Sequence, residues 1–150
     1  MKNLRVGLAL SGGGARGFAH VGVLKALREN NIPIDIIAGT SAGSFAGGAF
    51  AAGLEPDEII AVGNKIRWSD IAGFSYSRRG ILSNIPLGEF IRSNFPLNRI
   101  EDLRIQFAAC ACDLETGQEI VFRDSGDLPT AIRASCAIPG IFVPVDLDGK

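Results

Sequence analysis

The sequence predicts one domain of the α/β class, built around a mostly parallel central sheet. Short apolar runs without helical spacing, typical of buried strands, alternate in the first third of the chain with runs that have helical spacing. This order of strand, helix, strand and helix is typical of parallel strands joined by right-handed crossovers. The 150 residues, of which 47% are hydrophobic, are enough to build one core, and no linker or internal repeat interrupts them.

The expected elements follow the hydrophobic pattern along the chain. Strands or extended pieces are expected at residues 4–10, 34–38, 105–112, 119–123 and 142–147, with a hairpin turn at 115–118. Helices are expected at residues 17–28, 42–52, 86–95 and 128–137, and one more opens at 55–58. Residues 68–84 have no clear period, so we expect them to form either a lid that faces the substrate or a surface excursion.

A serine turn lies between the second predicted strand and the helix that follows it. The run Gly39-Thr40-Ser41-Ala42-Gly43 matches the pattern Gly-x-Ser-x-Gly. Such a turn lifts the serine above the sheet, and its glycines remove side chains that would clash. The N-terminus of the next helix then directs free N–H groups at the hydroxyl. We expect Ser41 to be the nucleophile of a serine acyl hydrolase, and the alternative is a serine that only caps the helix.

A glycine-rich loop follows the first predicted strand. Gly12, Gly13 and Gly14 can expose backbone N–H groups, as acyl transfer requires for the oxygen that becomes negative. The carboxyl ends of parallel strands lie at one edge of the sheet, so this loop and the serine turn should lie side by side. We expect the loop to form the oxyanion hole. Arg16 would lie in or beside it, or would instead pair with an acid on the surface.

The same loop has a competing interpretation as a phosphate cradle. Residues 12–17, ending at Gly17, satisfy Gly-x-Gly-x-x-Gly after a strand and before a helix, as in a nucleotide-binding α/β domain. However, Asp35 lies at the wrong end of the second strand to hold a ribose. Phe18 follows the last glycine where a phosphate-binding loop has lysine. Nucleotide binding would also leave the serine turn without a purpose.

The base that would activate the serine is not evident from the chain's only histidine. His20 lies on the first predicted helix, inside its apolar arc and away from the loop. A partly buried histidine with a structural hydrogen bond is therefore expected here. A serine hydroxyl needs an adjacent base, so that base would be a carboxylate or a lysine.

These motifs together resemble the patatin-like phospholipase family. Residues 11–17 resemble its first block, residues 39–43 its serine elbow, and residues 134–140 its Ala-Ser-x-x-x-Pro block, which supports the wall of the active site. The resemblance implies a three-layer α/β/α sandwich and a Ser-Asp dyad that needs no metal or other cofactor. It also implies acyl esters of phospholipids or lysophospholipids as substrates.

The sequence departs from the family at the aspartate block. The family's aspartate lies in an Asp-Gly-Gly or Asp-Gly-Ala triplet shortly after the wall block, whereas here Asp148-Gly149 is followed by Lys150. Asp148 is kept as a candidate base, but the dyad aspartate is expected after residue 150. Residues 1–150 are thus interpreted as the N-terminal portion of a C-terminally truncated patatin-like domain. An inactive fragment that acts as a binding or regulatory module is a further alternative.

Charge and hydropathy limit the partners and the location. The chain has 15 basic and 16 acidic residues, so it lacks the basic footprint of a nucleic-acid-binding protein. The apolar stretch at 6–10 is too short for a signal peptide, and a cytoplasmic location is expected. Residues 37–54 are uncharged over 18 positions, but a turn divides them, so we expect a buried strand and helix rather than a membrane span.

The expected partners are a lipid ester and, transiently, a membrane surface. The second expectation rests on the lipid substrates and on Trp68, Phe74 and Tyr76, three aromatic residues in the irregular stretch. A peripheral contact of this kind is compatible with a cytoplasmic protein. The sequence indicates no oligomeric state.

Overall fold

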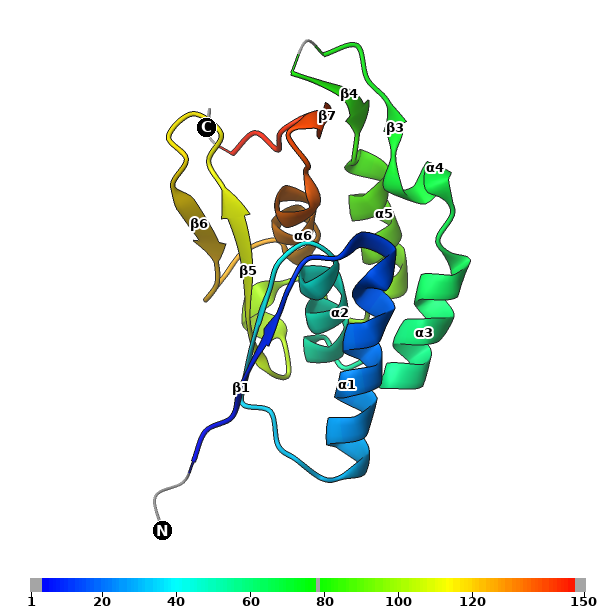
Figure 1. Cartoon of the computed structure of the whole chain (residues 1–150), viewed down its shortest axis with the longest axis vertical. Coiled ribbons are helices and arrows are strands. Elements are labelled where there is room, and N and C mark those ends of the chain that lie inside the picture. Colours follow the sequence, from blue (N-terminus) through cyan, green and yellow to red (C-terminus); the bar gives the residue numbers. More distant parts are fainter. Residues whose placement is uncertain (1–3, 78, 148–150) are drawn as a thin grey trace.

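The computed structural model describes residues 4–77 and 79–147 of the chain, and strands and helices alternate along it (Figure 1). In chain order the elements are β1 (Gly7–Leu10), the 3-10 turn η1 (Gly14–Gly17), α1 (Phe18–Glu29), β2 (Ile36–Gly39), α2 (Ala42–Ala51), α3 (Pro56–Lys65), α4 (Trp68–Ile71), β3 (Gly73–Phe74), β4 (Gly80–Ser83), α5 (Ile85–Asn94), the 3-10 turn η2 (Ile100–Asp102), β5 (Gln106–Cys112), β6 (Glu119–Phe122), α6 (Leu128–Cys136) and β7 (Gly140–Phe142).

The main sheet is mostly parallel, as predicted. Its strand order is β1-β2-β5-β6, in which the first three strands are parallel and β6 pairs antiparallel with β5. The predicted α/β class is therefore confirmed. The β5–β6 pair is the hairpin expected around residues 115–118.

The helices lie on one face of this sheet (Figure 1). The crossovers from β1 to β2 and from β2 to β5 move in the same direction, and right-handed connections then place their helices on the same side. On the opposite face, Ile36 and Val121 are 40% and 42% exposed. Among residues 4–77 and 79–147 the sheet thus has one helical layer, and the second layer of an α/β/α sandwich is not within this part of the chain.

The central helix α2 is made of small residues because it is pressed between the sheet and α6. A Cβ atom at Gly47 would lie 2.7 Å from Cγ2 of Ile37, and one at Gly48 would lie 2.9 Å from Cδ1 of Ile132. The uncharged residues 37–54 are therefore a buried strand and helix, as expected. No helix in the described part of the chain is long and apolar enough to cross a bilayer.

A second, smaller sheet lies where the sequence indicated irregular structure. Residues 68–84 contain α4 and the antiparallel pair β3–β4, and β4 also pairs in parallel with β7. The N–H of Val143 donates to the carbonyl of Leu82 at 2.7 Å. These strands are too short to give a period, and β4 depends on a partner far along the chain. The strand near the extended piece expected at 142–147 is β7, which covers Gly140–Phe142 and overlaps that piece only at Phe142.

The start of α2 lies against the end of β1, and the glycines of the serine turn allow this contact. A Cβ atom at Gly43 would lie 2.2 Å from the carbonyl oxygen of Leu10 and 2.6 Å from that of Ser11. A Cβ atom at Gly39 would lie 2.6 Å from the carbonyl oxygen of Gly43. Both glycines are thus needed because backbone occupies the space of a side chain.

This contact predicts opposite effects for two glycine-to-alanine changes. Gly43→Ala should lower the free energy of unfolding by about 3 kcal/mol or more, because backbone has to shift. Gly22→Ala, in α1, should raise it by about 0.5–1 kcal/mol, since its Cβ meets nothing within 4 Å. Urea unfolding measures both values. Equal unfolding free energies in the two variants would show that the contact at Gly43 is not tight.

Candidate active site

Ser41 lies on the turn between β2 and α2, in a strained backbone conformation. Its φ is 52° and its ψ is −121°, which a residue with a side chain rarely adopts. Ser41 occupies the N-cap position of α2, but its side chain makes no capping hydrogen bond. The capping-serine alternative therefore does not describe this turn.

Backbone and side-chain hydrogen bonds fix the serine turn in place. The N–H of Thr40 donates to the carbonyl of Leu10 at 3.0 Å, and the N–H of Gly43 donates to the carbonyl of Thr40 at 2.9 Å. The hydroxyl of Ser44 donates to the carbonyl of Ser41 at 2.6 Å. These bonds fix the backbone of the serine, and they leave its hydroxyl free of a structural task in the turn.

The glycine loop lies beside the serine turn, as the parallel topology predicted. A Cβ atom at Gly12 would lie 3.4 Å from the Cβ of Ser41, and one at Gly17 would lie 2.7 Å from the Cβ of Ala42. Gly14 has a φ of 53° and, like Gly17, lines the same cavity as Ser41. The two segments that sequence analysis singled out therefore meet.

Two further residues of the loop are exposed and are not among the described residues that line the cavity. Gly13 is exposed and caps η1, where its carbonyl accepts the N–H of Arg16 at 3.0 Å. Arg16 is also exposed, and the described lining of the cavity does not include it. No ion pair between described residues includes Arg16, so the surface pairing considered for it is not seen.

His20 has a structural hydrogen bond, as its place on the helix suggested. Its Nε2 lies 2.8 Å from the carbonyl oxygen of Ser11 and donates to it, because a carbonyl can only accept. The ring is partly buried on α1 and is not part of the cavity lining found among the described residues. The bond instead anchors the start of the glycine loop to α1.

The wall segment, residues 134–140, supports the serine turn through Ser135. The Ser135 hydroxyl accepts the backbone N–H of Ser41 at 2.8 Å and donates to the carbonyl of Cys110 at 2.6 Å. One hydroxyl thereby links the turn to β5 in the middle of the sheet. The Ala-Ser-x-x-x-Pro pattern indicated a supporting segment, but it did not indicate this contact.

Ser41 lines an apolar cavity of about 570 Å³, within the usual range of ligand sites, about 300–1,000 Å³. Six helices contribute to its wall, through Val21 of α1, Phe45 of α2, Ile59 of α3, Trp68 of α4, Leu87 of α5 and Cys136 of α6. No carboxylate, histidine or lysine lines it among the described residues. The candidate base Asp148 lies outside the described residues.

Cys136 is a neutral neighbour of the serine in this cavity. Burial raises the pKa of its thiol to about 11, and hydrogen bonds with Ser41 and Ser44 oppose the shift. The thiol is therefore protonated near neutral pH. Sequence analysis did not identify this neighbour.

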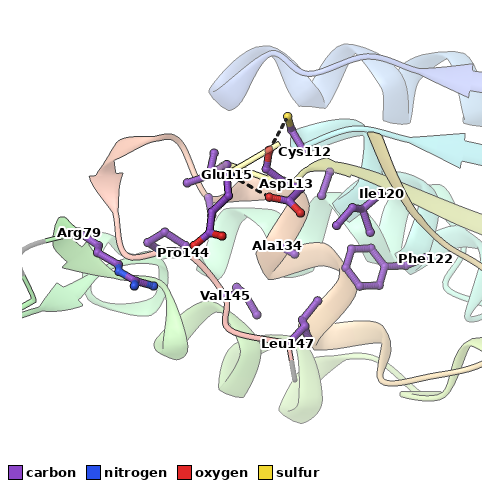
Figure 2. A pocket seen from close by; sticks show the side chains of 13 residues that line it. Arg79, Cys112, Asp113, Glu115, Ile120, Phe122, Ala134, Pro144, Val145 and Leu147 are labelled. Carbon is purple, nitrogen blue, oxygen red and sulfur yellow. Dashed lines mark hydrogen bonds between the residues drawn. The ribbon is translucent and has the colours of Figure 1, made fainter. Parts of the chain in front are cut away.

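A second cavity, of about 390 Å³, is lined in part by the wall segment (Figure 2). Ala134 and Ala137 line it, Asp113 and Glu115 reach it from the β5–β6 hairpin, and Arg79 lies on another side. The carboxylate of Asp113 accepts the N–H of Glu115 at 2.8 Å. Ser41 does not reach this cavity, and no cluster of described residues has the donors to hold a metal ion.

Known proteins are similar to this chain in sequence and in fold. A family profile described as patatin-like phospholipase matches residues 8–150. An uncharacterised NTE-family protein of Mycobacterium bovis is 42% identical over 97% of the chain and 41% of its own length. Lysophospholipase NTE1 of Candida glabrata is 32% identical over 97% of the chain and 9% of its own length.

Among solved structures, the type III effector protein ExoU has a similar fold. It superposes with a TM-score of 0.64 at 20% identity, over 91% of this chain and 40% of its own. This likeness concerns the fold alone. The chain spans about two fifths of the mycobacterial relative and of ExoU. With the family profile matched from residue 8 to residue 150, the chain belongs to the patatin-like phospholipase family.

Proposed function

We propose that this chain carries the nucleophile and the oxyanion-binding loop of a serine hydrolase that cleaves carboxylic esters of lipids. The observation that carries the proposal is the position of Ser41, which does not cap α2 and instead lines an apolar cavity. A nucleophile for a lipid ester has to meet a carbonyl at the end of an aliphatic chain, and this arrangement suits that need. Residues 1–150 would form the N-terminal portion of a patatin-like acyl hydrolase domain.

In the proposed reaction the hydroxyl oxygen of Ser41 attacks the ester carbonyl carbon while a base takes its proton. The carbonyl oxygen becomes negative, and N–H groups of Gly12, Gly13 and Gly14, in the loop beside the turn, would donate to it. Collapse of this intermediate releases the alcohol, which recovers the proton, and leaves the acyl group on Ser41. Water then attacks the acyl-enzyme, assisted by the same base, and frees the fatty acid.

The proposed base is the aspartate of the family's Ser-Asp dyad. It would come from the Asp-Gly-Gly or Asp-Gly-Ala triplet expected after Lys150, and Asp148 is the alternative. Cys136 is not suited to the role, because the raised pKa of its thiol keeps it protonated. His20 is not suited either, since its Nε2 donates to the carbonyl of Ser11 and its ring is not among the described residues that line the cavity of Ser41.

Two observations support a phospholipid or lysophospholipid as the substrate. The described lining of the cavity is apolar and suits a fatty acyl chain, and none of its residues is charged, so a polar head would stay outside. One relative is named a lysophospholipase and the family a phospholipase. An aliphatic chain held beside Ser41 agrees with both names.

No feature of the site favours the nucleotide-binding alternative. The glycine loop is pressed against α2, where a Cβ atom at Gly17 would lie 2.7 Å from that of Ala42. The cavity beside the loop has an apolar lining, whereas phosphate binding needs converging N–H groups and cations.

Replacement of the nucleophile tests the proposal in the polypeptide extended past Lys150 to include the aspartate triplet. Ser41→Ala should lower hydrolysis of a soluble nitrophenyl ester by about 10⁴-fold or more and abolish labelling by a fluorophosphonate. Ser93→Ala, which removes a hydroxyl bonded to Glu89 on α5, should leave both unchanged. If the folded parent protein is not labelled at all, the regulatory-module alternative gains and the hydrolase proposal fails.

Removal of the Ser135 hydroxyl tests the support of the serine turn. Ser135→Ala leaves the N–H of Ser41 without its partner, which should destabilise the protein by about 1–3 kcal/mol and lower kcat more than it raises KM. Ser135→Thr keeps a hydroxyl and should restore most of kcat. Steady-state kinetics and urea unfolding of both variants measure these effects. If threonine fails to restore kcat while stability returns, the hydroxyl does not position Ser41.

A further inference from the structure

An exposed apolar surface lies around the small sheet and α4. Its members are aromatic or aliphatic residues that are each 45% exposed or more: Trp68, Phe74, Tyr76, Ile81, Ile138 and Ile141, which we call the hairpin surface. Tyr76 is 96% exposed and Phe74 is 75% exposed, and their rings meet edge to face at 5.2 Å. Adjacent apolar side chains this exposed are unusual on a soluble monomer and mark a site of interaction.

The hairpin surface continues into the cavity that contains Ser41. Trp68, Ile138 and Ile141 are each 45% exposed or more, and each also lines that cavity. An aliphatic chain could therefore pass from outside the protein to the serine along apolar side chains. Such a route is useful only if the exposed end lies against an apolar phase.

The position of the hairpin agrees with a docking role. The β3–β4 hairpin and α4 lie at the same end of the molecule as the N-terminal ends of α1 and α2, and the hairpin extends beyond them (Figure 1). Ser41 lies at the N-terminal end of α2. A flat surface at this end of the molecule would thus lie on the same side as the N-terminal end of α2, where Ser41 lies.

The charge of this region favours an anionic surface. From Arg67 to Asn84 the sequence has three arginines and one acidic residue, Asp70. Arg67 and Arg79 are exposed, and no ion pair between described residues includes them. By contrast, Lys25 of α1 is paired with Asp57 at 2.6 Å. Exposed arginines that lie close in sequence to exposed aromatic residues are typical of proteins that bind the headgroup region of anionic membranes.

We propose that the hairpin surface docks the protein on a phospholipid bilayer that contains anionic lipid. The choice of a lipid partner rests on the proposed function, because the cavity to which the surface leads is assigned to an acyl chain. In the docked state Phe74 and Tyr76 insert among the headgroups, and Arg67 and Arg79 contact lipid phosphates. The acyl chain of a lipid then reaches Ser41 without crossing water.

Sedimentation with vesicles tests the docking without any turnover, in the extended polypeptide that carries Ser41→Ala. The parent should bind vesicles of phosphatidylcholine with phosphatidylglycerol more tightly than phosphatidylcholine alone. Phe74→Ser with Tyr76→Ser should lower the partition coefficient on both by about tenfold or more. Arg79→Gln should lower it only on the vesicles that contain phosphatidylglycerol.

The matched control replaces exposed apolar residues at the other end of the molecule. Leu4 is 88% exposed and Ile32, on the connection from α1 to β2, is 44% exposed. Leu4→Ser with Ile32→Ser should bind vesicles as the parent does. Thermal unfolding of each variant verifies that the fold is intact.

Three outcomes separate this inference from the proposed function. Unchanged vesicle binding after the loss of Phe74 and Tyr76 overturns the docking surface. It is also overturned if the parent ignores vesicles and instead self-associates through those two residues, as sedimentation velocity would record. Vesicle binding that depends on both aromatics, together with no hydrolysis of a soluble ester by the protein with Ser41 intact, keeps the docking surface and removes the hydrolase.

Discussion

The close approach of α2 to the end of β1 is the constraint on which the rest of the site depends. Gly43 lies so near the carbonyl of Leu10 that no side chain could fit between them. This approach brings the serine turn and the glycine loop together, because the loop begins where β1 ends. It also lets the N–H of Thr40 reach the carbonyl of Leu10, which ties the turn to the neighbouring strand. The position of Ser41 is therefore a product of backbone packing.

The strained serine is supported from the far side by the wall segment. Ser41 has a φ of 52°, which is strained for a residue other than glycine, so neighbouring groups have to hold it in that conformation. Ser135 does so by linking the N–H of Ser41 to a carbonyl of β5, the strand beside β2. The serine turn, the glycine loop and the wall segment are thus all attached to the main sheet. A displacement of β5 would move all three.

Sequence reasoning succeeded where structure follows from local pattern. The helix expected at 42–52 is α2, because a run of small residues between a buried strand and a glycine leaves little choice. The meeting of the serine turn and the glycine loop followed from parallel topology.

The features that the sequence did not reveal depend on distant contacts. Ser135 is 94 positions from Ser41, and nothing in its neighbourhood indicates that its hydroxyl accepts that N–H. The β3–β4 hairpin gave no period, since its strands have two and four residues and one of them relies on β7. The hydrophobic pattern also did not predict which apolar residues are exposed. Ile81 and Ile141 would be assigned to a core from their residue type, yet they are 68% and 45% exposed.

The one-sided placement of the helices has an evolutionary consequence. The turn, the loop and the apolar cavity are built on the helical side, so the opposite side of the sheet, with Ile36 and Val121, contributes none of their atoms. Additional polypeptide can pack on that side without disturbing the turn, the loop or the cavity. This freedom suits a family in which the same stretch makes up 41% of one relative and 9% of another.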